Sequence, residues 1–211
     1  MSTYELIVQN QTEILTVASI AIMMAMSPGA DFALVTKNSL SDSRKAGIYT
    51  TFGITIGVWV HISYCIAGLA VLIYTTPQIY SSIKLLGALY LIYIGIKSFL
   101  SKQNTNNEEY TPIKMKPIAA ITGGFLSNAL NPKTTLFFLG IFTQLVNKET
   151  PLSLQFIYGS IISLAHLVWF ATLSYLLTNK HLLPKTKKYQ NAINKLLGVV
   201  LIALGIKLIF L

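Results

Sequence analysis

Residues 20–35 read IAIMMAMSPGADFALV, and the break inside this apolar stretch decides how the whole chain is interpreted. The apolar run stops at Ser27-Pro28-Gly29 and resumes beside a carboxylate, Asp31. A proline inside a helix removes a backbone hydrogen bond and clashes with the preceding turn, so the helix ends or kinks there. The stretch therefore predicts two shorter helices in series, with a charge next to their junction.

The composition of the chain is that of an integral membrane protein. Of the 211 residues, 53% are hydrophobic and 11% are charged, and the mean hydropathy is +0.60. Soluble domains carry about 25% charged residues. We expect one all-α membrane domain over residues 1–211, with six transmembrane helices of about 20 mainly apolar residues each. The net charge of +9 is interpreted as a set of topology signals in a lipid bilayer, so we expect no nucleic-acid partner.

Six hydrophobic segments can be drawn along the chain. The first is broken at Pro28 and the fourth at Asn131-Pro132. A polar, Asn-rich linker at residues 101–112 separates the third segment from the fourth. The six segments cover residues 14–35, 46–74, 83–100, 118–146, 152–178 and 192–211.

The basic residues predict how these segments are oriented. Twelve of the sixteen lysines and arginines fall in the first, third and fifth connections, Lys97 among them. Loops rich in Lys and Arg stay cytoplasmic. With six spans, both termini would then lie outside. The N-terminus lacks the basic start of a cleaved signal peptide, and a single cysteine, Cys65, excludes an intrachain disulfide.

The order of features repeats in the two halves of the chain. Pro28 is followed 33 residues later by His61, and Pro132 is followed 34 residues later by His166. Each half then continues into a segment that begins KLLG. Three spans per half place the second copy upside down, which is the inverted repeat found in many transporters. The two predicted repeats are residues 1–105 and 106–211.

Both breaks are expected deep in the membrane. Thirteen apolar residues precede each break, and a helix of that length rises only about 20 Å against a hydrocarbon core of about 30 Å. Ser and Asn favour the N-cap and proline favours the first helical position. New helices are therefore predicted to start at Ser27-Pro28 and at Asn131-Pro132. Their free N–H groups carry partial positive charge and must face protein, water or an anion.

We predict that the two breaks and Lys133 form an electropositive pocket for a substrate carboxylate. Lys133 is the second residue of its half-helix, where the helix dipole opposes a cation, and a residue that breaks a local rule is a candidate for function. Asp31 or carbonyls freed at the breaks would receive an ammonium, which suits a free amino acid. The alternatives are that Asp31 only stabilises a helix start and that Lys133 snorkels toward an interface. The predicted substrate-binding residues are Ser27, Pro28, Gly29, Asp31, Asn131, Pro132 and Lys133.

His61 and His166 fall in the middle of apolar segments, where ionisable residues are functional candidates. Because histidine titrates near neutral pH, we consider both histidines, together with Asp31, as candidates for proton coupling. The alternative is a histidine that is hydrogen-bonded to a neighbouring helix. Two histidines without cysteine or carboxylate partners make a poor metal site, so we expect no metal and no cofactor.

The motifs SPGADFALVTKNSL and GFLSNALNPKTTLFF, at residues 27–40 and 124–138, resemble the LysE/RhtB family of bacterial amino-acid exporters. The resemblance implies a multi-pass protein of the bacterial inner membrane that exports amino acids or their derivatives with the proton gradient. A second proline that is common after the motif glycine is Ala30 here, which leaves the substrate open. The family's motif residues fall on Pro28, Gly29, Asn131, Pro132 and Lys133.

Three other functions compete with proton-coupled export of zwitterions. An inorganic cation exporter would have few ligands, since Asp31 and Cys65 are nearly the only intramembrane carboxylate and thiol. An intramembrane enzyme lacks HExxH, GxSxG and paired membrane aspartates. An assembly subunit would not need deep breaks, which are costly unless used. We therefore predict a transporter that is not an enzyme, and a homo-oligomer is compatible with the sequence.

Overall fold

The computed structural model describes residues 3–75, 77–100, 114–147, 149–179 and 181–209. Over these ranges the chain forms nine α-helices and no strand, which confirms the predicted all-α fold class. The helices are α1 (Thr3–Gln9), α2 (Gln11–Met26), α3 (Ala30–Ser41), α4 (Arg44–Thr75), α5 (Pro77–Leu100), α6 (Pro117–Ala129), α7 (Pro132–Leu145), α8 (Leu152–Thr178) and α9 (Leu183–Ile209).

Two helices are long and apolar enough to cross a membrane by themselves: α8, and α4 over Arg44–Gly68. A third crossing results if α2 and α3, which bend by 56° at their junction, are counted as one span. The apolar parts of α5 and α9, Leu85–Leu100 and Asn194–Ala203, are shorter. The described helices thus support a multi-pass membrane protein with two or three crossings, and the six-span arrangement stays a prediction.

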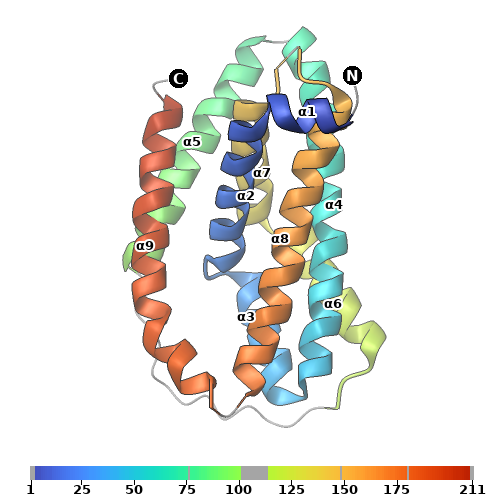
Figure 1. Ribbon diagram of the computed structural model, residues 1–211, viewed down its shortest axis with the longest axis vertical. Helices are drawn as coiled ribbons and strands as arrows, with labels where there is room; N and C mark the ends of the chain where they lie inside the picture. Colours follow the sequence, from blue (N-terminus) through green and yellow to red (C-terminus); the bar gives the residue numbers. More distant parts are fainter. Residues whose placement is uncertain (1–2, 76, 101–113, 148, 180, 210–211) are drawn as a thin grey trace.

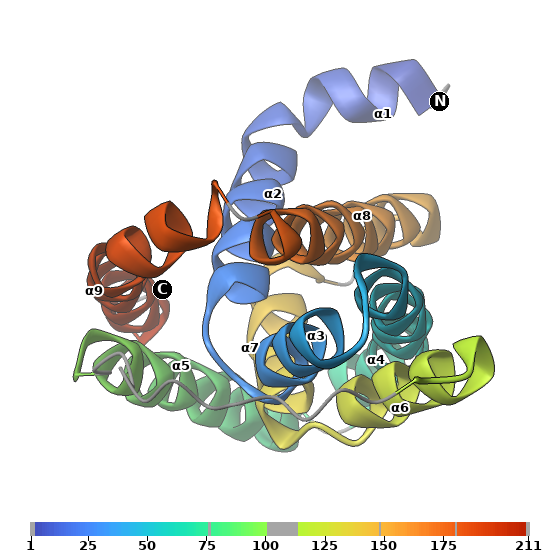
Figure 2. The same cartoon turned by 90° about the horizontal axis from the view of Figure 1, so that it is seen from below.

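The broken helices lie at the centre of the bundle. Seen from below, α2, α3 and α7 are flanked by α4, α6 and α8 on one side and by α5 and α9 on the other (Figure 2). The long helix α4 packs against α6 and α8, α2 packs against α8, and α5 packs against both α9 and α7. The junction between α2 and α3 lies about halfway along the bundle (Figure 1). The first break therefore lies inside the bundle and not at one of its ends.

Two buried apolar clusters hold the central helices in place. The larger cluster joins α2, α4, α7 and α8, and the smaller one surrounds the first half of α3. Between lipid-exposed helices the hydrophobic drive is weak, because lipid tails are as apolar as leucine, so close packing has to supply the stability. Fully buried members of the larger cluster include Val17, Ile62, Phe138 and Tyr158, and those of the smaller one Val35 and Ile54.

Helices α5 and α7 cross at a pair of glycines. A Cβ added at Gly140 would lie 3.1 Å from the Cα of Gly87, which is backbone and cannot move aside. Small residues at such crossings let helix backbones approach closely in lipid. The crossing brings the face of α5 that carries Tyr90 and Lys97 close to the start of α7.

The break before α7 is built as the sequence predicts. Asn131 is the N-cap, and its side-chain oxygen accepts a hydrogen bond from the backbone N–H of Lys133 at 3.0 Å. Pro132 occupies the first helical position, where its missing N–H is not needed. The start of α7 is therefore a fixed point from which the Lys133 side chain extends.

The break before α3 is built differently, and the prediction that Ser27-Pro28 starts the new helix is wrong. Ser27 is the C-cap of α2, Gly29 is the N-cap of α3, and the helix begins at Ala30. A residue before proline is pushed out of the helical region, and Ser27 accordingly has ψ of 126°. Its hydroxyl bonds the Lys133 ammonium instead of capping an N–H.

Candidate functional site

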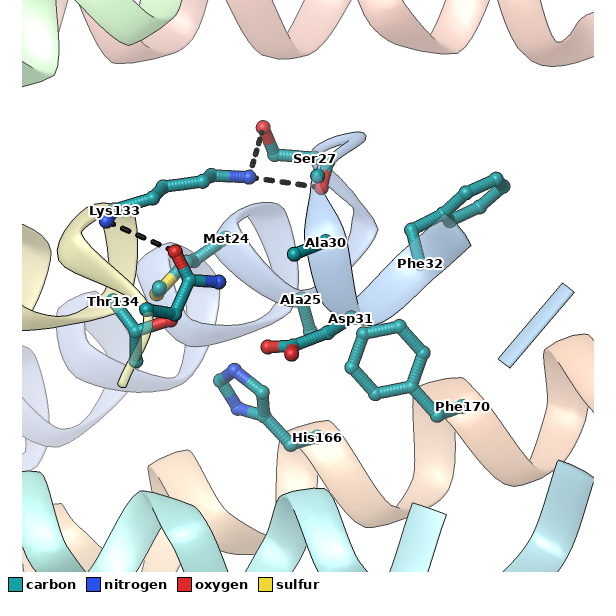
Figure 3. A pocket seen from close by; sticks show the side chains of 12 residues that line it. Met24, Ala25, Ser27, Ala30, Asp31, Phe32, Lys133, Thr134, His166 and Phe170 are labelled. Carbon is teal, nitrogen blue, oxygen red and sulfur yellow. Dashed lines mark hydrogen bonds between the residues drawn. The ribbon is translucent and has the colours of Figure 1, made fainter. Parts of the chain in front are cut away.

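The side chain of Lys133 joins the two breaks (Figure 3). Its Nζ donates to the carbonyl oxygen of Ser27 at 3.0 Å, to Oγ of Ser27 at 2.9 Å and to the carbonyl oxygen of Pro28 at 3.2 Å. All three acceptors are neutral, so these bonds satisfy the ammonium without cancelling its charge. The cation therefore stays inside the bundle, and the structure brings both breaks together at it.

Gly29 leaves the space that the Lys133 side chain occupies. A Cβ built on Gly29 would lie 3.2 Å from Nζ and 3.3 Å from Cδ of Lys133. The backbone of Gly29 is extended, with φ of −176°, which any residue can adopt. A side chain at position 29 would therefore require the Lys133 side chain to shift by a few tenths of an ångström, whereas the backbone conformation itself does not require glycine.

Asp31 lies in the first turn of α3 and is 7% exposed. Its Oδ1 accepts a hydrogen bond from Oγ of Ser127, and its Oδ2 accepts one from Nδ2 of Asn128, both at 2.7 Å. Both partners belong to α6, so the carboxylate ties the start of α3 to the end of α6. The sequence pattern gives these partners no role, although they stand three or four residues before Asn131.

Asp31, Lys133 and His166 line a small cavity of about 10 Å³. This is room for about one water molecule. Figure 3 shows the Asp31 carboxylate and the His166 ring turned toward one another across this space. The hydroxyl of Thr134, which also lines the cavity, is buried without a partner among the described residues. The cavity thus has the size and the polar lining to link Asp31 and His166 through a single water.

His61 is fully buried but is not among the residues that line this cavity. Its Nε2 lies 2.9 Å from the carbonyl oxygen of Asn128, and its Nδ1 lies 2.7 Å from the Tyr64 hydroxyl. The ring stacks on Phe138 with a centroid distance of 5.3 Å. This is the arrangement of a histidine that bonds a neighbouring helix. Its hydrogen-bonded link to Asp31 runs through Asn128.

A larger cavity of about 470 Å³ shares Lys133 with the small one. Ligand pockets are typically about 300–1,000 Å³, so this volume suits a small metabolite. The two breaks form one wall and α5 forms the other. From the breaks it is lined by residues 27–30 and 131–133, and from α5 by Tyr90, Tyr93, Ile94, Lys97 and Ser98.

The wall formed by α5 includes Lys97, which lies in the last turn of that helix and not in the connection after it. Lys97 lies inside α5 and reaches the cavity together with Tyr90 and Tyr93. Residues three and four apart share one face of a helix, so the spacing of 90, 93 and 97 is the one sequence feature that indicates this wall. Within the described ranges no group of three or more His, Cys, Asp or Glu side chains gathers that could hold a metal ion.

Comparisons with known proteins give matches over most of the chain. The family described as LysE type translocator matches residues 22–211. The chain is 36% identical to YrhP, an uncharacterised membrane protein of Bacillus subtilis, over 198 residues that cover 89% of this chain and 94% of YrhP. It is 27% identical to the leucine efflux protein of Salmonella typhimurium over 192 residues, which cover 89% of this chain and 90% of that protein. No solved structure matches the chain.

Proposed function

Because the chain belongs to the LysE type translocator family, we propose that it exports amino acids or related zwitterionic metabolites from the cytoplasm. The leucine efflux protein among its relatives supports an amino acid as the substrate. The observation that carries the proposal is the cavity of about 470 Å³ that both helix breaks line and that Lys133 enters. Its volume, its depth and its cation suit a carboxylate-bearing metabolite.

The proposed site uses six of the residues that the sequence singles out. The carboxylate of the substrate binds the Lys133 ammonium and the N-terminal end of α7, where the helix dipole favours an anion. This binding draws Nζ away from the carbonyl oxygens of Ser27 and Pro28 and loosens the junction between the two breaks. The residues in contact with the substrate are Ser27, Pro28, Gly29, Asn131, Pro132 and Lys133.

We propose proton antiport as the driving force, with Asp31 as the proton carrier and His166 as its partner. The support is their shared cavity, which has room for about one water, and its contact with Lys133. A proton on Asp31 would change its bonds to α6, and with them the position of α3 relative to the substrate cavity. A role for His61 in coupling stays a prediction, supported only by its link to Asp31 through Asn128.

The proposed topology is six spans in two inverted repeats, residues 1–105 and 106–211, across the bacterial inner membrane with both termini outside. Its support is a correspondence between the halves: α2 and α3 match α6 and α7, α4 matches α8, and α5 matches α9. The packing of α4 on α6 has its counterpart in that of α8 on α2. In such transporters alternating access moves one repeat against the other around a central site.

Export is tested with inside-out membrane vesicles that contain the protein. Labelled amino acids are offered outside, and uptake is measured with a proton gradient and again after a protonophore collapses it. We expect at least one amino acid to accumulate, and only with the gradient. Failure of every amino acid to accumulate refutes the proposal, and uptake of a divalent metal in the same vesicles would identify an inorganic cation exporter instead.

A further inference from the structure

The substrate cavity has an excess of positive charge. Two lysines reach it, Lys133 from α7 and Lys97 from α5, and no carboxylate is among the described residues that line it. Asp31 lines the small cavity instead, and Ser127 and Asn128 hold its two oxygens. A charged substrate in this cavity therefore faces two lysine cations and no carboxylate among the described lining residues.

The neutral acceptors at the breaks are also engaged. The carbonyl oxygens of Ser27 and Pro28 bond the Lys133 ammonium, and Oδ1 of Asn131 bonds the Lys133 N–H. A substrate ammonium would compete with Lys133 for the same oxygens and would be repelled by its charge. A neutral zwitterion thus brings one carboxylate to two lysines and leaves the second lysine unmatched.

The wall formed by α5 offers places for both remaining groups of a larger substrate. Lys97 can pair with a second carboxylate. The rings of Tyr90 and Tyr93, whose centroids are 5.9 Å apart, line the cavity beside it. An ammonium over the face of an aromatic ring is attracted by the ring quadrupole. The cavity therefore offers two cations and an aromatic face. These groups complement a substrate that carries two carboxylates and an ammonium.

We propose that this cavity selects amino acids that carry a second carboxylate, with Lys97 as the residue that binds it. The inference rests on the proposed transport function and narrows its substrate class. It separates this chain from the leucine efflux relative, whose named substrate has a neutral side chain. Removing Lys97 should remove the preference for the acidic substrate.

The test uses the purified protein in liposomes loaded with substrate, and exchange of labelled amino acid is measured without a proton gradient. Glutamate is compared with glutamine, and aspartate with asparagine, since each pair differs in charge and hardly in shape. The comparison is repeated with Lys97→Gln and with Lys97→Arg. Lys195→Gln is the matched control, because Lys195 is exposed on α9 and is not among the residues that line the cavity.

We expect the unaltered protein to exchange the acidic member of each pair roughly tenfold to a hundredfold better, the effect of one hydrogen bond to a charged group. Lys97→Gln should bring the two members within about threefold of each other, whereas Lys97→Arg and Lys195→Gln should keep the preference. Equal or better exchange of glutamine, asparagine or leucine by the unaltered protein overturns the inference and leaves the proposed function intact. Exchange of no amino acid at all overturns both.

Discussion

Replacing Lys133 with methionine tests the site most directly, because it removes the ammonium and nearly preserves the length of the side chain. Three hydrogen bonds to the first break are lost. If a substrate carboxylate also binds here, its affinity loses one hydrogen bond to a charged group, about 1.5–3 kcal/mol. That is roughly a tenfold to hundredfold loss of exchange at low substrate concentration.

The effect of the same change on stability should be small. The freed oxygens of Ser27 and Pro28 border the cavity of about 470 Å³, so water can replace the lost donor. Removing a charge from the interior also recovers part of its desolvation cost. We expect these opposing contributions to leave the free energy of unfolding within about 2 kcal/mol of the original value, comparable to one or two hydrogen bonds.

The assay measures substrate exchange in liposomes and thermal unfolding in detergent on the same preparation. Lys195→Met is the matched control, since it removes a lysine from outside both cavities. The reasoning predicts a large loss of exchange for Lys133→Met with little change in unfolding, and no loss for the control. Exchange at the original rate by folded Lys133→Met would refute the role of the ammonium.

Further substitutions separate coupling from packing. Asp31→Asn should abolish accumulation driven by a proton gradient while substrate exchange continues; gradient-driven uptake that persists in this variant contradicts the proposed carrier. His166→Asn should reduce gradient-driven uptake severalfold. His61→Asn should mainly lower the free energy of unfolding, by about 1–3 kcal/mol, because its hydrogen-bond partners are left unpaired. Uptake and thermal unfolding measured on both variants distinguish a role in coupling from a role in packing. Gly140→Ala should lower that free energy by about 1–3 kcal/mol, since its Cβ meets the backbone of α5. Gly68→Ala, with nothing within 4 Å, should be neutral or stabilising in a thermal unfolding assay.

The sequence predicts the breaks well because their cause is local. Proline disrupts a helix whatever surrounds it, and Asn131 caps α7 as its residue type favours. Ser27 has the same preference, but it is the C-cap of α2, and its hydroxyl accepts a hydrogen bond from Lys133, 106 residues away, instead of capping an N–H. A local rule fails there because a tertiary contact competes for the same oxygen.

The remaining parts of the site depend on which helices are neighbours. Ser127 and Asn128 become partners of Asp31 only when α6 ends beside the start of α3. Lys97 reaches the cavity only because α5 crosses α7 closely, and its position along the chain does not reveal this. Charge and periodicity along the chain do not specify such crossings.

The fit of Lys133 into the space beside Gly29 couples two positions that are far apart in the sequence. A larger residue at 29 would collide with the lysine stem, and a shorter residue at 133 would leave the first break without its donor. Among related chains, size at the first position should therefore vary inversely with length at the second. A chimera that joins the first half of one homologue to the second half of another should function only where this pair is matched.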